Sequence, residues 1–128
     1  MKEPKICLLV DDDPDDQEVF LTALNDVSTS ALCLVAADGD RALELLHNEE
    51  TIPHYIFLDL NMPRMNGFEF LAAMKKSRVL RDIPVIVYST TSQPAQIEKA
   101  KKLGATEFFT KTYKYHELCS LLKRYFGD

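Results

Sequence analysis

Five short, largely apolar runs are the sequence feature that most limits how this chain can fold. Apolar strands without polar alternation are typical of a parallel sheet that is buried on both faces. Stretches of helical period separate the runs; in the last, Leu118, Leu121, Leu122 and Tyr125 share one face. The runs are residues 6–10, 32–36, 55–58, 85–88 and 107–110. Strict alternation predicts an α/β fold: a doubly wound, five-stranded parallel sheet with five helices, in one domain spanning residues 1–128.

Composition excludes several classes of protein. A net charge of -5 argues against direct nucleic-acid binding, because phosphate recognition needs a basic face. No apolar run approaches the roughly 20 residues that cross a bilayer, and no signal peptide is visible. Cys7, Cys33 and Cys119 lie in apolar segments and are interpreted as buried hydrophobes in a reducing, cytoplasmic compartment; a regulatory thiol is the alternative.

The acidic run at residues 11–16 divides into two parts. Asp13 suits a helix N-cap with Pro14 at the first helical position, and the next two acids, at 15 and 16, offset the helix dipole. This leaves Asp11 and Asp12 at the end of the first strand without a capping role. A solvated acidic loop is the plain alternative for this pair.

A further acid, Asp59, ends the run at residues 55–58. If the two strands are neighbours, the acids share the carboxyl edge of the sheet, where open α/β sheets bind ligands. Two like charges about 4 Å apart repel by roughly 4 kcal/mol near a protein surface, which favours a bound cation. Pro63 and Gly67 predict a sharp connection after Asp59, in which Gly67 is free to adopt a positive φ. Alternatively, Asp59 only caps a turn.

Two more side chains are expected at the same edge. Ser89 closes the fourth strand, and Lys111 follows the fifth. Carboxylates suit Mg²⁺, which also accepts phosphate oxygens, and a carboxylate can form an acyl phosphate. A cation, an ammonium and a hydroxyl would then neutralise the three phosphoryl oxygens.

In these motifs, and over its whole length, the chain resembles the receiver domain of two-component response regulators, the CheY-like family. The resemblance implies that Asp59 is phosphorylated, that Asp12 binds Mg²⁺ directly, and that Asp11 binds it largely through water. It implies that the backbone carbonyl of Asn61 is a further ligand. Ser89 matches the switch hydroxyl, and Lys111 matches the lysine that pairs with the phosphoryl group.

The resemblance also assigns roles around this site. Phe108 occupies the position of the aromatic rotamer switch, although it is equally a core residue by its pattern. Asn61 and Thr91 match the pair that tunes dephosphorylation. One departure is Thr112, which stands where the family usually has a proline joined by a cis peptide. Because a cis bond to a non-proline residue costs about 2.5–4 kcal/mol, we expect the Lys111–Thr112 peptide to be trans.

The resemblance implies a histidine kinase or phosphotransfer protein as phosphodonor. It implies a downstream protein on the surface of the fourth helix, fifth strand and fifth helix. The net charge and the lack of a long apolar run argue against nucleic acid and membrane as partners. Tyr113 and Tyr115 are candidate anchors on that surface. Lysines near it form either a basic patch or a solvated face; they are Lys99, Lys101, Lys102, Lys114 and Lys123. Since the chain ends about a helix after Lys111, we expect a stand-alone receiver rather than an enzyme.

Three alternatives keep the same fold. A phosphohydrolase with an aspartyl nucleophile needs a second acid two residues later, where Asn61 stands. A flavin binder needs a Gly- and hydroxyl-rich phosphate loop after the first strand, where this chain has acids. A degenerate receiver that serves only as a binding module is disfavoured by the intact set of Asp11, Asp12, Asp59, Ser89 and Lys111.

Overall fold

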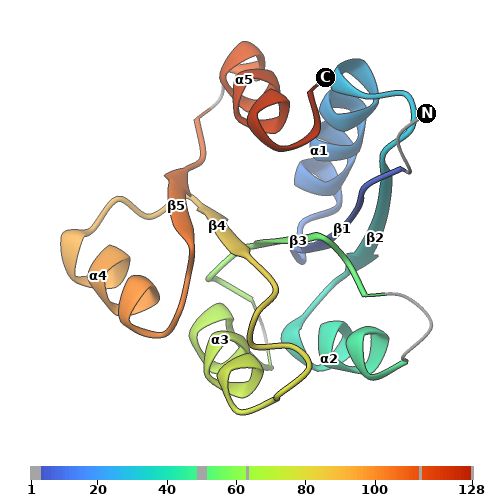
Figure 1. Cartoon of the computed structure of the whole chain (residues 1–128). Helices are drawn as coiled ribbons and strands as arrows, with labels where there is room; N and C mark the ends of the chain where they lie inside the picture. The colour runs from blue at the N-terminus through green and yellow to red at the C-terminus, as the bar shows by residue number, and fades with distance from the viewer. Residues whose placement is uncertain (1–3, 49–51, 63, 113, 128) are drawn as a thin grey trace.

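A computed structural model describes residues 4–48, 52–62, 64–112 and 114–127 (Figure 1). Strands and helices alternate along it as predicted, and the fourth strand is one residue longer than its apolar run, ending at Ser89. The strands are β1 (Ile6–Val10), β2 (Leu32–Ala36), β3 (Tyr55–Leu58), β4 (Val85–Ser89) and β5 (Glu107–Thr110). The helices are α1 (Pro14–Val27), α2 (Gly39–His47), α3 (Gly67–Lys75), α4 (Pro94–Lys102) and α5 (Tyr115–Phe126).

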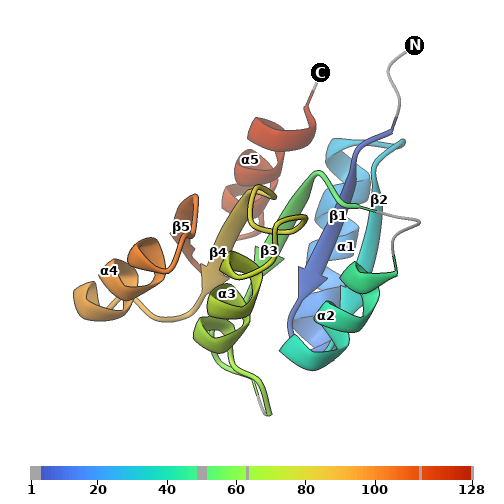
Figure 2. The same cartoon turned by 60° about the horizontal axis from the view of Figure 1, so that its bottom comes forward.

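The strands form one parallel sheet in the order β2-β1-β3-β4-β5. Helices α1 and α5 cover one face of this sheet, and α2, α3 and α4 cover the other (Figures 1 and 2). The chain reverses direction across the sheet between β1 and β3, because β2 lies to one side of β1 and the later strands to the other. This switch point is where ligands bind in sheets of this kind.

Two apolar cores explain why the strand sequences lack polar alternation. Leu8 and Val10 of β1 face the core under α2, α3 and α4, while Cys7 and Leu9 face the core under α1 and α5. Successive strand side chains point to opposite faces. Both sets are at most 2% exposed, so each position in the run must be apolar.

Local capping interactions set the ends of the helices. The Asp13 side chain accepts hydrogen bonds from the backbone N–H groups of Asp15 and Asp16, which confirms its predicted N-cap role. At the end of α4, Gly104 has a φ of 106°, and its N–H donates to the Lys101 carbonyl. With the bond from the Ala105 N–H to the Ala100 carbonyl, this is a Schellman motif, and Gly104 ends the helix.

Cys7 and Cys33 lie directly opposite each other on β1 and β2, and both thiols are free, as is Cys119. The neighbouring Cys33 thiol and burial raise the pKa of the Cys7 thiol far above its ordinary value. Cys7 is fully buried, as predicted, whereas Cys33 and Cys119 are only partly buried. No helix in the described part of the chain has both the length and the apolar character needed to span a bilayer.

Candidate functional site

The acids at the ends of β1 and β3 lie together at the carboxyl edge of the sheet. The two strands are hydrogen-bonded neighbours, and the Asp59 N–H donates to the Val10 carbonyl at 2.9 Å. The Asp11 N–H likewise donates to the Ala36 carbonyl of β2 at 3.0 Å. One carboxylate oxygen from each of Asp11, Asp12 and Asp59 lies within 4.8 Å of the others. The structure therefore brings together the three acids that the sequence singled out.

The environments of these acids differ. Asp11 is 2% exposed, and its Oδ1 accepts from the Asp13 N–H at 3.0 Å. Asp59 is 8% exposed, and its Oδ1 accepts from the Asn61 N–H at 3.3 Å. Asp12 is exposed. Burial raises the pKa of the Asp11 carboxyl, and the hydrogen bond from Lys111 opposes that rise. A second positive charge, such as a metal ion, would further favour the charged form.

The loop after Asp59 differs from the prediction at Gly67. Gly67 begins α3 and does not have a positive φ; in the described chain the positive φ in this loop belongs to Arg64, at 61°. A Cβ on Gly67 would lie 2.7 Å from the Leu60 Cα and 2.8 Å from the Asp59 carbonyl oxygen. Glycine is therefore required because α3 packs directly against the backbone that carries Asp59. Pro63 lies outside the described residues.

Lys111 supplies the positive charge of the site. Its Nζ lies 2.8 Å from Asp11 Oδ2, 2.9 Å from Asp16 Oδ2 and 3.6 Å from Asp59 Oδ2. Burial alone would lower the pKa of the ammonium, but the bonds to Asp11 and Asp16 raise it above its ordinary value. Lys111 is therefore fully charged at neutral pH. From its place in the sequence Asp16 is expected only to offset the helix dipole, so its contact with Lys111 was not predicted.

The backbone that leads to Lys111 is held by the pairing of β5 with β4. The Lys111 N–H donates to the Ser89 carbonyl at 2.6 Å, so β4 and β5 stay paired up to the site. The described residues contain no cis peptide bond, and the Lys111–Thr112 peptide is trans, as predicted. The Thr112 hydroxyl donates to a carboxylate oxygen of Glu117 in α5 at 2.6 Å.

The other predicted residues lie around this centre. Ser89 is fully buried, and its Oγ has no hydrogen-bond partner among the described residues. Phe108 is half-buried and packs against the core beneath α2, α3 and α4. Thr91 caps the start of the next turn, where its hydroxyl accepts from the Gln93 N–H at 3.3 Å. Asn61 is exposed beside Asp59.

A hollow adjoins the acids on the side of the loop after β3. Asp12 and Asn61 both line it, and its volume is about 410 Å³. Carboxylate and carbonyl oxygens, with room for water, are what Mg²⁺ requires. The donor set of Asp11, Asp12 and Asp59 therefore fits this ion.

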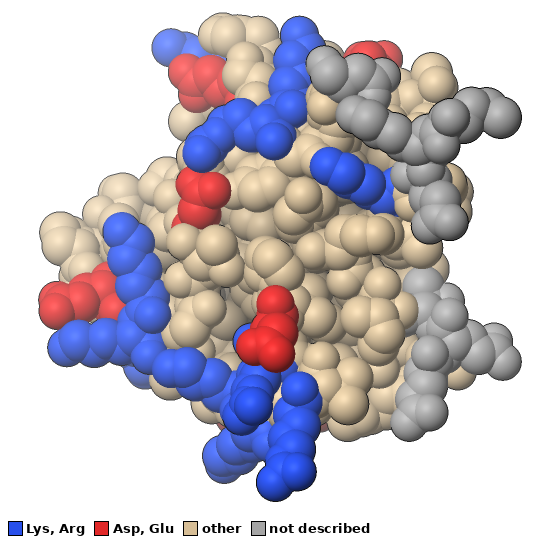
Figure 3. All heavy atoms as spheres, viewed as in Figure 1, with Lys and Arg blue, Asp and Glu red and all other residues tan. Residues whose placement is uncertain are grey.

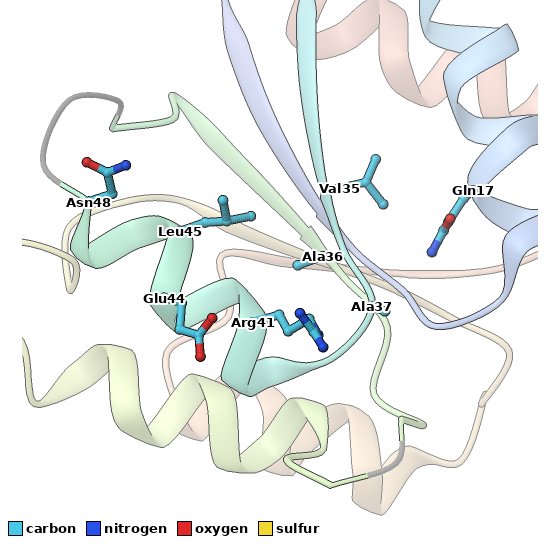
Figure 4. A pocket seen from close by; sticks show the side chains of 8 residues that line it. All are labelled: Gln17, Val35, Ala36, Ala37, Arg41, Glu44, Leu45 and Asn48. Atoms are coloured by element: carbon cyan, nitrogen blue, oxygen red, sulfur yellow. The ribbon is translucent and has the colours of Figure 1, made fainter.

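A second hollow, of about 510 Å³, lies along β2 and α2, and none of the three acids lines it (Figure 4). The Gln17 side chain, on its wall, donates to the Asp11 carbonyl at 2.6 Å. Its other lining residues are Val35, Ala36, Ala37, Arg41, Glu44, Leu45 and Asn48. It contains one basic and one acidic side chain, and nothing in it indicates chemistry.

Basic side chains gather where α3 and α4 end, at the lower left of Figure 3. Lys75 Nζ donates to the Lys102 carbonyl at 2.8 Å, and Lys99 Nζ lies 4.4 Å from the centre of the Phe68 ring. These contacts assign part of the lysine cluster to helix capping and packing. Tyr115 is 42% exposed and donates to Asp26. Tyr113 lies outside the described residues.

Comparisons with known proteins agree with this geometry. The family model described as a response regulator receiver domain matches residues 7–123. The rice (Oryza sativa) two-component response regulator ORR11 is 34% identical over 122 residues, covering 94% of this chain and 80% of that protein. The Helicobacter pylori sensor histidine kinase CheAY is 29% identical over 119 residues; the match covers 93% of this chain but only 15% of the kinase.

Solved structures show the same relationship. The phosphorylated cyanobacterial phytochrome response regulator RcpA superposes with a TM-score of 0.86 at 28% identity, covering 94% of this chain and 90% of that one. Receiver domains of this family are signalling domains of two-component systems rather than classical enzymes. The strand order, the acid cluster at the carboxyl edge and the family match together lead to one conclusion: the chain belongs to the response regulator receiver domains.

Proposed function

We propose that Asp59 accepts a phosphoryl group from a histidine kinase or phosphotransfer protein, with Mg²⁺ bound beside it. The observation that carries this proposal is the joint position of the acids and Lys111. The Asp59 carboxylate has the Asp11 and Asp12 carboxylates near it, which can share a cation with it, and the Lys111 ammonium 3.6 Å away as a counter-charge. The phosphorylated state of the related RcpA supports the same assignment.

The transfer exchanges one bond to phosphorus for another. A carboxylate oxygen of Asp59 forms the new O–P bond while the P–N bond of a phosphohistidine breaks, and the histidine nitrogen takes up a proton. The product is an acyl phosphate. Phosphoryl transfer requires positioning and charge neutralisation more than covalent chemistry. Lys111 neutralises one phosphoryl oxygen, and the Ser89 hydroxyl is an unused donor for another.

Asp11, Asp12 and Asp59 would hold the magnesium ion, together with the Asn61 carbonyl and water. When bound, Mg²⁺ supplies positive charge to the transferring phosphoryl oxygens. Asp11 is buried and fixed by the Asp13 N–H, so it holds its position without the ion. The exposed Asp12 and Asn61 face the hollow from which water enters. Asn61 and Thr91 would tune dephosphorylation; both side chains are small and uncharged, so neither is expected to block the approach of water.

In this proposal, phosphorylation signals to other proteins by changing the surface formed by α4, β5 and α5. Phosphorylation biases a two-state equilibrium, through the Ser89 hydroxyl and Phe108, toward a different α4–β5–α5 face. A downstream protein then binds that face. The three free cysteines suit a reducing compartment, and the proposal places this phosphotransfer in the cytoplasm.

The test is incubation of the purified chain with acetyl phosphate and Mg²⁺, followed by intact mass measurement. The wild type is expected to gain the mass of one phosphoryl group. Asp59→Asn is expected to gain none, while Asp82→Asn, an exposed site in another loop, behaves as wild type. Failure of the wild type to gain mass, under conditions that label a related receiver, would overturn the proposal.

A further inference from the structure

The ion pair between Asp16 and Lys111 is not part of the function described so far. Asp16 lies in the first turn of α1 and Lys111 follows β5, so the contact joins parts of the chain 95 residues apart. We propose that Asp16 is a positioning residue that holds the Lys111 ammonium toward α1 before phosphorylation and gives it up afterwards. This inference rests on the proposed function of Asp59.

The distances show how the ammonium is shared. A lysine has three N–H donors. Two of them are hydrogen-bonded, to Asp11 at 2.8 Å and to Asp16 at 2.9 Å. Asp59 Oδ2, at 3.6 Å, is near enough for electrostatic attraction, but the pair forms no hydrogen bond. In this state Lys111 is bound more closely by the two neighbouring carboxylates than by the acceptor itself.

The exposure of the Asp11 and Asp16 carboxylates indicates which of them loses its bond to Lys111 on phosphorylation. The Asp11 side chain is 3% exposed, whereas that of Asp16 is 43% exposed. Breaking a buried pair leaves an uncompensated charge in the interior, but an exposed carboxylate regains its hydration. A phosphoryl group carries nearly two negative charges on three acceptor oxygens, and it replaces the single charge of the Asp59 carboxylate. Lys111 therefore turns from Asp16 to the phosphoryl group and keeps Asp11.

The contact also accounts for how Lys111 is held beside the trans peptide to Thr112. Asp16 restrains the end of the side chain from α1, independently of the loop that follows β5. Release places an unpaired carboxylate at the wall of a hollow of about 540 Å³ between α1 and α5. The hollow is also lined by Val19, Tyr88 and Tyr115, so phosphorylation would change the charge of a partly apolar surface.

The test uses Asp16→Asn, which keeps the side-chain shape and removes its charge. Asp15→Asn is the matched control, since Asp15 is exposed in the same helical turn and its side chain has no ion pair within the described residues. The first readout is the NMR signal of the Lys111 side chain, assigned by its loss in Lys111→Gln. This measurement is made on the unphosphorylated protein, so it does not depend on the proposed function of Asp59. The signal is expected to shift in Asp16→Asn and to stay in place in Asp15→Asn.

The second readout is the affinity for beryllium fluoride, a phosphoryl mimic, in the presence of Mg²⁺. An exposed ion pair contributes up to about 1 kcal/mol, so Asp16→Asn is expected to tighten binding by up to about fivefold. In the Lys111→Gln background, the same substitution is expected to have no such effect, because the competition acts through Lys111. Asp16→Glu, which keeps the charge, is expected to restore wild-type affinity.

Each outcome bears on one claim. An unchanged Lys111 signal in Asp16→Asn would overturn the inference, and so would weaker binding or a gain of equal size in the Lys111→Gln background. Absence of beryllium fluoride binding by the wild type would overturn the proposed function and the release step. The Lys111 signal would then still decide whether Asp16 holds the lysine.

Discussion

Replacing Ser89 with alanine is expected to stabilise the protein while impairing its response. The Ser89 side chain is fully buried at the end of β4, and its Oγ has no hydrogen-bond partner among the described residues. A buried hydroxyl without a partner loses its hydration and gains nothing in return, at a cost of about 1–3 kcal/mol. Alanine removes the oxygen and leaves the rest of the side chain in place.

The expected gain is about 1 kcal/mol in the free energy of unfolding, at the lower end of that cost because some packing contacts disappear with the oxygen. For a domain of this length it corresponds to a rise in Tm of about 3–5 °C. Urea unfolding followed by circular dichroism, without Mg²⁺, measures the gain directly, with an unchanged m-value. The same variant is expected to bind beryllium fluoride more weakly, because a donor to the phosphoryl group is lost.

Ser77→Ala is the matched control. The Ser77 hydroxyl accepts a hydrogen bond from the Leu80 N–H at 3.2 Å, so its removal is expected to destabilise the fold by about 1 kcal/mol. If Ser89→Ala destabilised the protein as Ser77→Ala does, the Ser89 hydroxyl would have a partner in the resting state. The interpretation that the Ser89 hydroxyl has no partner until it donates to the phosphoryl group would then be wrong.

Three further changes test other parts of the structure. Gly67→Ala is expected to cost about 1–3 kcal/mol in urea unfolding, and to slow phosphorylation, because its Cβ would overlap the backbone of Leu60 and Asp59. Gly104→Ala is expected to cost about 1–2 kcal/mol in the same assay without slowing phosphorylation, since an alanine would be strained at a φ of 106° and its Cβ would meet only the flexible Lys75 side chain. Mg²⁺ is expected to raise the Tm measured by calorimetry, EDTA to reverse the rise, and Asp12→Asn to abolish it. If Gly67→Ala left the stability unchanged, the close packing of α3 on the Asp59 backbone would be contradicted. Slow phosphorylation of Gly104→Ala would show that this position affects the site, and a Tm that does not depend on Mg²⁺ would contradict the metal site.

The fold could be predicted because its signal is local. Each strand is a short apolar run, and residues such as Leu8 and Leu9 face different cores, so burial on both faces leaves no polar position. The acid cluster followed from the same pattern, since Asp11 and Asp59 directly end two of these runs and parallel strands share one carboxyl edge. The apolar runs therefore predict the architecture, and the acids at their ends predict the site.

The features that could not be predicted from the sequence depend on how far long side chains reach and on close packing between elements. Asp16 has an evident local role in the first turn of α1, and its contact with Lys111 is seen only in the three-dimensional structure, because it depends on how far the lysine side chain reaches. Gly67 was interpreted as free to adopt a positive φ, whereas the reason for glycine is the contact of α3 with the Asp59 backbone. Neither the missing partner of the Ser89 hydroxyl nor the half-burial of Phe108 has a sequence signal of its own.

The most direct test of the central claim is to locate the phosphoryl group after labelling with acetyl phosphate and Mg²⁺. Borohydride reduces an acyl phosphate to an alcohol, so the modified aspartate becomes homoserine and survives peptide sequencing by mass spectrometry. The account predicts homoserine at position 59, and none there when Mg²⁺ is omitted or Asp59 is replaced by Asn. Homoserine at position 11 or 12, or at no position in a protein that has gained mass, would contradict it.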